Sequence, residues 1–355
     1  MKAKKLSALL LAVVMIFSLA ACGSKTPKTD ANATRIFTDS TGREVEVPAQ
    51  IDKVALSGPL AQIVLFALCP DKLVGVSNAW SSEAQEFLDE KYFNMPQIGQ
   101  LYGGKGELNL ETLLQSGAQV VIDVGESKGS IKEDMDSLQQ QTGIPFVHIS
   151  ADMQSYPQAY RMLGDLLGMK TEAEALATYC EKIYSRTETI ASGVEKANVL
   201  YVTGDMGQNV IAKGSYHAEI LDLLTNNLAQ VDEPSSKGTG NEVSMEQILT
   251  WNPDVVIFAP ESIYATVKDD AAWQSVTAIK NGAYYEVPFG PYNWMGFPPS
   301  VQRYLGMVWL SKLLYPDAMA DYDLFADVQE YYKLFYHCDI TRAQYDALVA
   351  NSIGK

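Results

Sequence analysis

The sequence predicts an α/β fold in which two similar lobes are joined by a long helix. Short apolar runs typical of buried strands alternate with helical patterns in both halves of the chain. Residues 153–193 interrupt this alternation with two consecutive helical patterns. One helix–strand unit also occurs twice, once before and once after that interruption. Strands separated by helices indicate right-handed crossovers, so each lobe is expected to hold a mainly parallel sheet.

Composition places the chain among globular proteins and excludes several functions. Of its 355 residues, 47% are hydrophobic and 20% are charged. This length fits two domains at ~100–200 residues each. The formal charge of −16 argues against a nucleic-acid surface, and three His residues leave little material for a zinc cluster. The composition does not suggest a multi-pass membrane protein.

The N-terminal segment predicts secretion and lipid attachment. Three lysines precede an apolar run over residues 6–21, a run shorter than the ~20 residues of a membrane-spanning helix. Residues 1–21 are therefore interpreted as a signal peptide. Leu19-Ala20-Ala21-Cys22 has the form of a bacterial lipobox with Cys22 as the lipidation site, and residues 22–34 would form a polar tether. A diacylated cysteine anchors stably to a membrane surface. An ordinary signal with a chance cysteine, or a buried N-terminal helix, is the alternative.

The predicted N-terminal lobe covers residues 35–152. Alternation on both sides of Gly42 predicts a β-hairpin over 35–48. The remaining expected strands are 54–56, 73–76, 120–122 and 146–149, and the expected helices are 60–68, 110–115 and 131–141.

The interlobe helical segment covers residues 153–193. Its first helix is expected to end at Gly168. Thr171 and Glu174 have the spacing of a capping box, which predicts a second helix over 172–191. A helix of that length is about 30 Å long at 1.5 Å per residue, enough for a stiff strut between lobes.

The predicted C-terminal lobe covers residues 194–355 and includes a helical tail over 323–351. The expected strands are 199–202, 210–212, 255–258 and 284–287, and the expected helices are 217–224 and 300–314. Aromatic residues of the tail at 331–336 are expected to pack in the core. Cys69 and Cys180 lie in apolar helical contexts, so we expect buried free thiols without redox chemistry.

The duplicated unit is the most informative pattern. Residues 109–114 followed by 118–122 parallel residues 244–249 followed by 253–257, each as a capped short helix and a buried strand. Each copy places an acid, Glu111 or Glu246, early in its helix. Such an acid stabilises a helix through the helix dipole. One acid per lobe at the same position also suits a two-pronged contact with a symmetric partner.

These features together resemble one family. The lipobox, the opening Phe37-Thr38-Asp39-Ser40-Thr41-Gly42-Arg43, the paired acids and the helical strut resemble bacterial ABC-transporter substrate-binding lipoproteins for iron–siderophores, haem and cobalamin. This resemblance to the class III periplasmic-binding-protein fold implies two Rossmann-like lobes with ligand held between them. It implies a monomer on the outer face of the cytoplasmic membrane. It also implies docking through Glu111 and Glu246 on arginines of the two subunits of a permease dimer.

Three loops supply the candidate ligand residues, since ligands in parallel α/β lobes bind beyond the carboxyl ends of strands. The candidates are Tyr102 and Lys105 in the first loop, Lys213, Tyr216 and His217 in the second, and Tyr292, Trp294 and Met295 in the third, followed by Arg303. Residues 78, 80 and 81 form a fourth possible rim. Tyr292 and Trp294 suit the flat face of a macrocycle or catecholate chelate.

Metal ligation by these loops is an open hypothesis. His217 suits either iron ligation or simple hydrogen bonding, and Met295 is a possible soft iron ligand. Relatives often carry Arg where this chain has Phe297, which weakens the case for an Arg-clamped anionic siderophore.

The sequence thus favours capture of an iron complex, siderophore or haem, with no cofactor of the protein's own. A corrinoid is the alternative, and a metal-ion receptor is disfavoured by the three His residues. A structural lipoprotein would need no aromatic loops between lobes. No HExxH or P-loop motif is present, so we expect no enzyme, although a perturbed acid–base pair between the lobes would favour one.

Overall fold

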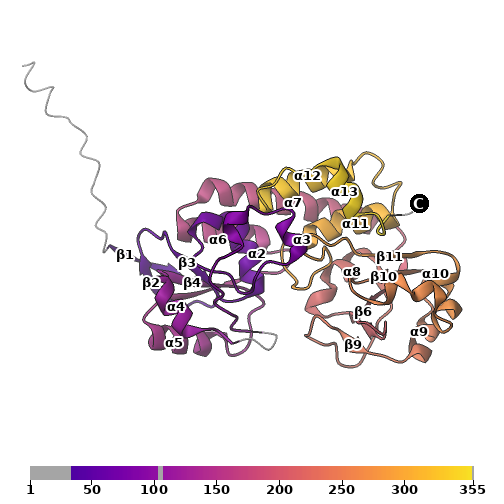
Figure 1. The fold of residues 1–355 in the computed structure, drawn as a ribbon, viewed down its shortest axis with the longest axis horizontal. Coiled ribbons are helices and arrows are strands. Elements are labelled where there is room, and N and C mark those ends of the chain that lie inside the picture. Colours follow the sequence, from indigo (N-terminus) through magenta and orange to yellow (C-terminus); the bar gives the residue numbers. More distant parts are fainter. Residues whose placement is uncertain (1–32, 103–106, 354–355) are drawn as a thin grey trace, which may run out of the picture.

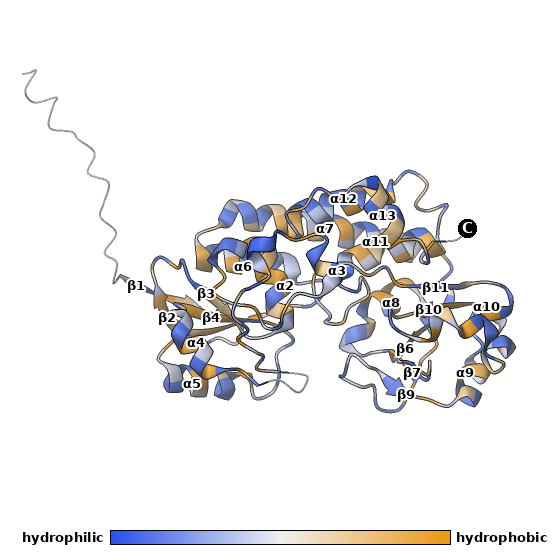
Figure 2. Ribbon diagram, viewed as in Figure 1, coloured by the Kyte–Doolittle hydropathy of each residue, from blue (hydrophilic) through white to orange (hydrophobic). Residues whose placement is uncertain are grey.

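The computed structural model describes residues 33–102 and 107–353 and shows two lobes, each containing a sheet, beneath a shared layer of helices (Figure 1). The signal peptide, Cys22, most of the tether and Lys105 lie outside the described residues. The strands are coloured mainly as apolar residues, whereas the helices combine apolar and polar ones (Figure 2). Among the described residues, no helix combines the length and apolar character that a membrane crossing requires.

The N-terminal lobe is built on a three-stranded parallel sheet of order β3-β4-β5, flanked by an antiparallel hairpin. Its strands are β1 (Thr34–Thr38), β2 (Glu44–Pro48), β3 (Val54–Leu56), β4 (Val120–Gly125) and β5 (Phe146–Ser150). Its helices are α2 (Pro59–Leu68), α3 (Ser82–Gln85), α4 (Leu110–Ser116) and α5 (Ile131–Thr142). Every residue of β3 and β4 is buried, as expected for strands covered on both faces.

The expected strand at 73–76 is wrong. Leu73 forms a single bridge with Val54, and Val76 forms a single bridge with Gln97. The chain changes its partner between these two residues, so no continuous ladder develops. The intervening Gly75 lies against Ile98 and the Pro96 carbonyl, where a β-carbon would clash.

Two consecutive helices, α6 (Tyr156–Leu167) and α7 (Lys170–Gly193), form the shared layer. At 24 residues, α7 is about 36 Å long. It contacts α2 of the N-terminal lobe and both α8 and α11 of the C-terminal lobe. The buried positions of α7 include Leu176, Tyr179, Cys180, Ile183 and Ile190, the face that the sequence predicted.

The capping box predicted at Thr171 is wrong, because α7 begins two residues earlier than expected, with Met169 at its N-cap and no side-chain cap. The Glu174 carboxylate does not reach back to the helix start, because it pairs with an arginine of the preceding helix. It accepts hydrogen bonds from Arg161 of α6 at 2.9 and 2.7 Å. The ion pair between α6 and α7 has therefore replaced the capping interaction that was expected within α7.

The C-terminal lobe holds a six-stranded sheet of order β11-β10-β6-β7-β9, with β8 also paired to β6. Its strands are β6 (Asn198–Thr203), β7 (Asn209–Val210), β8 (Asn226–Asn227), β9 (Asn241–Glu242), β10 (Val255–Phe258) and β11 (Tyr284–Glu286). Its helices are α8 (Glu219–Leu224), α9 (Met245–Trp251), α10 (Thr277–Lys280) and α11 (Arg303–Leu314). The strand expected at 210–212 is only β7, and β7 runs antiparallel to β6.

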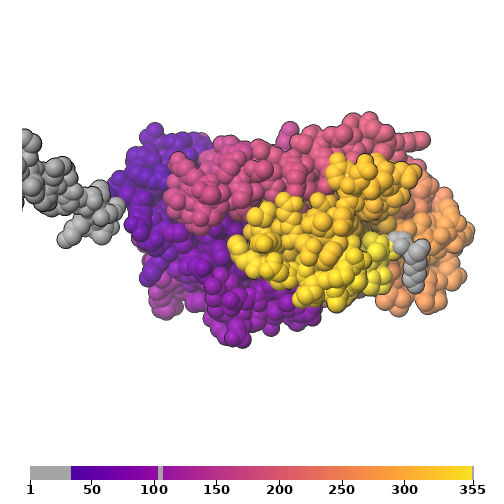
Figure 3. Space-filling view, turned by 90° about the horizontal axis from the view of Figure 1, so that it is seen from above, coloured from indigo at the N-terminus to yellow at the C-terminus, as the bar shows by residue number. Residues whose placement is uncertain are grey.

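The C-terminal tail forms α12 (Leu324–Phe335) and α13 (Arg342–Leu348) and lies across the helical layer. The sequence grouped this tail with the C-terminal lobe, yet α12 contacts α2, α7 and α11. In the view from above, the tail lies between the two lobes (Figure 3). Its aromatic residues are buried as expected, and Phe335 stacks on Tyr331 with ring centroids 4.2 Å apart.

Replacing Ile183 with alanine is expected to destabilise the protein by about 2–5 kcal/mol, because the fully buried side chain lies on the helix that both lobes share. Urea unfolding measures the change. Ser185→Ala, an exposed position of the same helix, serves as the control and should stay within about 0.5 kcal/mol of the parent. A loss at Ile183 as small as that of the control would contradict the role of α7 as a buried strut.

Candidate functional site

The carboxyl ends of the N-terminal strands meet a segment of the C-terminal lobe. Strand β5 ends at Ser150, and the hydroxyl of Tyr216 donates to the carbonyl of the next residue, Ala151, at 2.7 Å. Met153 N–H, at the start of the interlobe segment, donates to Glu219, and Ser300 donates to the carbonyl of Leu60 in the N-terminal lobe. This junction is where a parallel α/β fold places its ligands.

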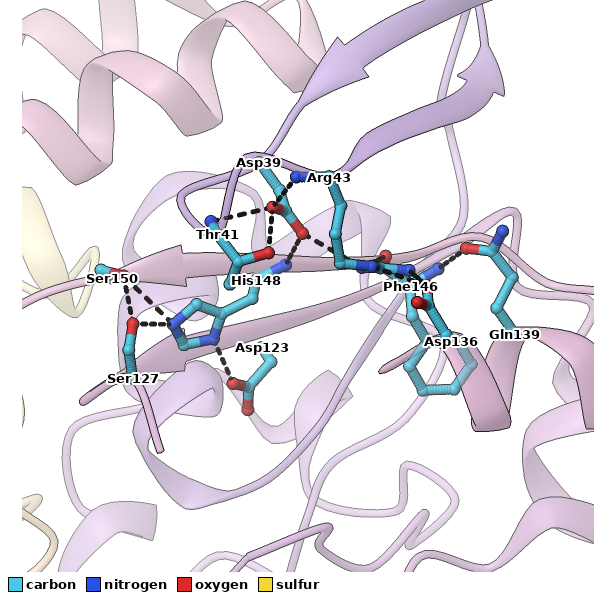
Figure 4. Close-up of polar contacts among 10 residues, drawn as sticks. All are labelled: Asp39, Thr41, Arg43, Asp123, Ser127, Asp136, Gln139, Phe146, His148 and Ser150. Carbon is cyan, nitrogen blue, oxygen red and sulfur yellow. Dashed lines mark hydrogen bonds and ion pairs between the residues drawn. The ribbon is translucent and has the colours of Figure 1, made fainter. Parts of the chain in front are cut away.

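We call Ser127, Ser150, Tyr216, His217 and Phe297 the interlobe face. Its N-terminal part is supported by the polar network in Figure 4. His148 of β5 is fully buried, with Nδ1 2.6 Å from the Asp123 carboxylate of β4. Its Nε2 lies 2.9 Å from Ser127 Oγ and 3.2 Å from Ser150 Oγ. Ser57, at the end of β3, donates to the other oxygen of Asp123.

The hairpin opening holds the backbone of His148 in place. Ser40 N–H donates to the His148 carbonyl at 3.0 Å, and the Asp39 carboxylate accepts from His148 N–H at 3.3 Å. Burial of Asp39 raises its pKa, but hydrogen bonds from Thr41, Arg43 and His148 outweigh burial and leave the pKa below its usual value. The Thr-Asp-Ser-Thr-Gly-Arg segment therefore has a structural role beneath the serines.

The number of protons decides what the two serines offer a ligand. The Ser127 and Ser150 oxygens are 2.5 Å apart, so one hydroxyl proton must lie between them. The pair carries a second hydroxyl proton, which can point to His148 Nε2 or turn outward to a ligand, because a hydroxyl rotates to suit its partner.

Tyr102 lies on the same lobe, and its hydroxyl is already bonded. It donates to Asp134 of α5 at 2.6 Å, and Lys128 Nζ lies 5.6 Å from the centre of its ring. Burial and the bond to Asp134 raise the pKa of Tyr102 well above its usual value, so the hydroxyl stays protonated. Lys128, one residue beyond Ser127 in the sequence, thereby places its cation over the Tyr102 ring.

The C-terminal part of the interlobe face combines a neutral imidazole with an exposed ring. Burial and the nearby Arg303 guanidinium lower the pKa of His217 to about 4, so its imidazole is neutral at pH 7. The Phe297 side chain is 58% exposed and lies against Gly238, where a β-carbon would overlap the ring. The same β-carbon would lie 3.1 Å from His217 Cε1, so Gly238 brings the two rings together.

Three residues predicted to bind ligand are buried in the structure. Trp294 is 0% exposed and Met295 2%, both within the main core cluster. Arg303 is also fully buried, with Nη2 2.6 Å from Glu219 and Nη1 donating to the Tyr216 carbonyl at 2.8 Å. These partners stabilise the folded state, because a buried guanidinium without partners would raise the free energy of the folded protein. None of the three offers a surface to a ligand in this conformation.

The other predicted residues are dispersed. Tyr292 accepts a hydrogen bond from Gln62 at 3.3 Å, and its ring contacts buried Trp80, which belongs to the fourth predicted rim. Lys213 is exposed, and its backbone N–H donates to Ala229. In the part of the chain that the structure describes, no three His, Cys, Asp or Glu residues form a group that could hold a metal ion.

The duplicated helices are nearly identical in construction. Asn109 caps α4 by accepting from Thr112 N–H, and Ser244 caps α9 by accepting from Gln247 N–H. Both seven-residue helices end in a left-handed residue, at Gly117 and Asn252. Glu111 and Glu246 are both exposed. In Figure 1, α4 and α9 lie on different lobes, both on the side away from the helical layer.

Sequence reasoning missed Ser127, Ser150, Asp123 and the role of His148. The signal was nevertheless available, because all four residues lie within or just beyond two buried strands whose carboxyl ends meet. Only their pairing across the sheet could not be read from spacing. Strand β5 aligns His148 opposite Asp123 in the parallel register.

Comparisons with known proteins agree with this architecture. A family model described as "Periplasmic binding protein" matches residues 54–290. The molybdate-binding protein MolA of Haemophilus influenzae is 24% identical over 343 residues, which cover 90% of this chain and 95% of that protein. An ABC transporter solute binding protein from Sulfurospirillum deleyianum is 26% identical, with a TM-score of 0.81 over 89% of this chain and 99% of that one. A periplasmic solute binding protein from Veillonella parvula is 24% identical, with a TM-score of 0.76 over 90% and 98% of the two chains.

The lowered pKa of His217 predicts loss of stability in acid. The unfolded chain takes up this proton near pH 6.5 and the folded chain only near pH 4. The stability linked to a neutral His217 is therefore complete above pH 6.5 and is lost as the pH falls towards 4. Urea unfolding between pH 7 and 4 should show a shallower decline for His217→Gln than for the parent. His337→Gln, which removes an exposed imidazole, is the control. An unchanged slope in His217→Gln would contradict the prediction.

Proposed function

The chain belongs to the periplasmic binding protein family and is a solute-binding protein of an ABC transporter, and we propose that it captures a compact, oxygen-rich anion between its lobes. The observation that carries the proposal is the pair of hydroxyls, Ser127 and Ser150, held by His148 and Asp123 where the lobes meet. An ordered hydroxyl pair beside Lys128 is suited to the oxygen atoms of an anion.

The proposed ligand is a metal oxyanion such as molybdate. The Haemophilus influenzae relative bears the name of a molybdate-binding protein, which supports this ligand class. The burial of Trp294 and Met295 supports it too, because these side chains were the ones expected to face a large flat chelate. A compact anion needs hydrogen-bond donors rather than broad aromatic surfaces.

The serine pair can donate to the oxygens of an anion, because a hydroxyl rotates to suit its partner. His148 and Asp123 hold the pair in place from beneath, with His148 Nε2 2.9 Å from Ser127 Oγ and Nδ1 2.6 Å from the Asp123 carboxylate.

An iron complex, either a siderophore or haem, is the second candidate. The exposed Phe297 ring beside the neutral His217 favours it, because an aromatic face and an imidazole suit a chelate. A corrinoid fits the same two groups. In either case the complex would contact the C-terminal part of the interlobe face, whereas the oxyanion would contact the serine pair.

Catalysis is not the proposed role, although Ser127, His148 and Asp123 have the atom order of a catalytic triad. The Ser127 oxygen is also bonded to Ser150, and the imidazole is fully buried. The family consists of solute-binding proteins, and we assign the network to ligand binding.

The family is extracytoplasmic and works with membrane permeases. We propose that lipid at Cys22 anchors this chain to the outer face of the cytoplasmic membrane as a monomer. We further propose that Glu111 and Glu246, exposed on matching helices of the two lobes, dock on the two subunits of the permease dimer.

Calorimetric titration of the full chain with molybdate, a ferric catecholate complex and haem tests the ligand. Molybdate should bind, and Ser127→Ala should weaken its binding at least tenfold by removing one of the ordered hydroxyls. Ser137→Ala, an exposed serine on the same lobe, is the control.

Binding of haem or ferric catecholate without molybdate, lost in Phe297→Ala but retained in Ser127→Ala, would contradict the oxyanion and support the second candidate. Molybdate binding that Ser127→Ala leaves unchanged would contradict the role given to the serine pair.

Replacing both Glu111 and Glu246 with alanine should abolish solute transport and leave solute affinity unchanged, because both acids lie on α4 and α9 and not on the interlobe face. Uptake into permease-containing vesicles and calorimetry measure the two quantities. Glu133→Ala with Glu242→Ala removes one acid from each lobe elsewhere and is the control. A large loss of solute affinity in the docking variant would refute the docking role.

A further inference from the structure

Two exposed leucines occupy equivalent positions in the duplicated helices. Leu114 of α4 is 52% exposed and Leu249 of α9 is 38% exposed. Among the described residues only seven large hydrophobic side chains are exposed in this way, and these two are the leucines among them. Each follows the exposed acid of its helix, Glu111 or Glu246, by three residues.

That spacing puts the acid and the leucine on one face of each helix, since residues three apart are neighbours on a helix surface. The preceding residues, Leu113 and Ile248, are both 0% exposed and fix each helix to its own lobe. With one side buried and caps at both ends, the exposed side of each helix is held in a defined orientation.

Stability within the chain does not account for the leucines. Helix propensity is nearly the same for leucine, glutamine and lysine, so a polar residue would serve these surface positions equally well. A single exposed leucine is ordinary on a protein surface. Two leucines, each beside an acid and one on each lobe, instead match a partner that has two equivalent surfaces.

We propose that Glu111 with Leu114, and Glu246 with Leu249, form two equivalent contact elements for the two subunits of the permease dimer. Each permease subunit would provide a cation beside an apolar pocket. The proposal rests on the docking role proposed above and adds the apolar half of the contact.

The two halves of each element have different physical roles. The carboxylate provides charge complementarity, which directs the approach of the partner. The leucine removes apolar surface from water on contact and excludes water from the neighbouring ion pair, where the lower dielectric strengthens attraction. A pair of acids alone would give a contact that salt screens easily.

Binding of the full chain to its cognate permease in lipid nanodiscs tests this proposal. Leu114→Ala with Leu249→Ala should weaken binding about tenfold or more and make the remaining affinity more sensitive to salt. Each single substitution should lie between the double variant and the parent. Solute affinity should not change and the melting temperature should change little, because neither leucine belongs to a core cluster or lies on the interlobe face.

A matched control removes one exposed apolar side chain from each lobe outside the duplicated helices. Ile36 is 59% exposed and Met206 is 73% exposed, so Ile36→Ala with Met206→Ala provides it. This control should bind the permease as the parent does.

Each remaining outcome has one meaning. If the paired Glu variant loses binding while the leucine variant equals the control, the apolar contact is refuted and docking by acids stands. If neither variant loses binding while solute binding persists, the docking surface itself is refuted. If the leucine variant instead loses self-association measured by sedimentation, the occupant is a second copy of this chain and the proposal is overturned.

Discussion

The structure depends on the burial of one face of α7 against both lobes. Ile183 and Cys180 of this helix are fully buried, and the helix contacts α2 on one side and α8 and α11 on the other. Each sheet contributes its own core, but α7 fixes where the two sets of carboxyl ends lie relative to one another. The tail strengthens this arrangement: the Arg186 guanidinium of α7 lies 2.7 Å from Asp327 of α12, and both side chains are nearly buried. A straight helix without a proline resists bending, which favours modest rather than large lobe closure.

The interlobe face follows from this constraint. Tyr216 reaches Ala151 and the Glu219 carboxylate reaches Met153 only because the helical layer brings the two lobes together. Beneath that junction, the N-terminal sheet supports a polar network in which a buried imidazole lies between a carboxylate and two hydroxyls. The network fixes the positions of the two hydroxyl oxygens at the interlobe face.

The two lobes also carry matching outer surfaces. The two copies of the duplicated unit agree in side chains as well as in backbone. Both have the same kind of caps, one buried apolar residue, one exposed acid and one exposed leucine. Each short helix is anchored by one apolar side chain and orients two side chains outward. Two such helices on one rigid frame present a pair of contacts at a fixed separation, the arrangement that a two-subunit partner requires.

By itself the sequence determined most of the elements and the duplication. Strands 54–56 and 255–258 were predicted with the observed bounds, since a short apolar run flanked by turn residues is too short for a helix and is typical of a buried strand. The exposed acids followed from matching caps and helices, which are local features. The tertiary structure alone decided what each long-range group contacts. Glu174 pairs with Arg161 instead of capping its helix, Leu73 and Val76 bridge to different partners, and Arg303 is buried against Glu219. The network of Asp123, His148, Ser127 and Ser150 was missed for the same reason: its members come from two strands whose register is set by packing, and no spacing along one chain encodes that register.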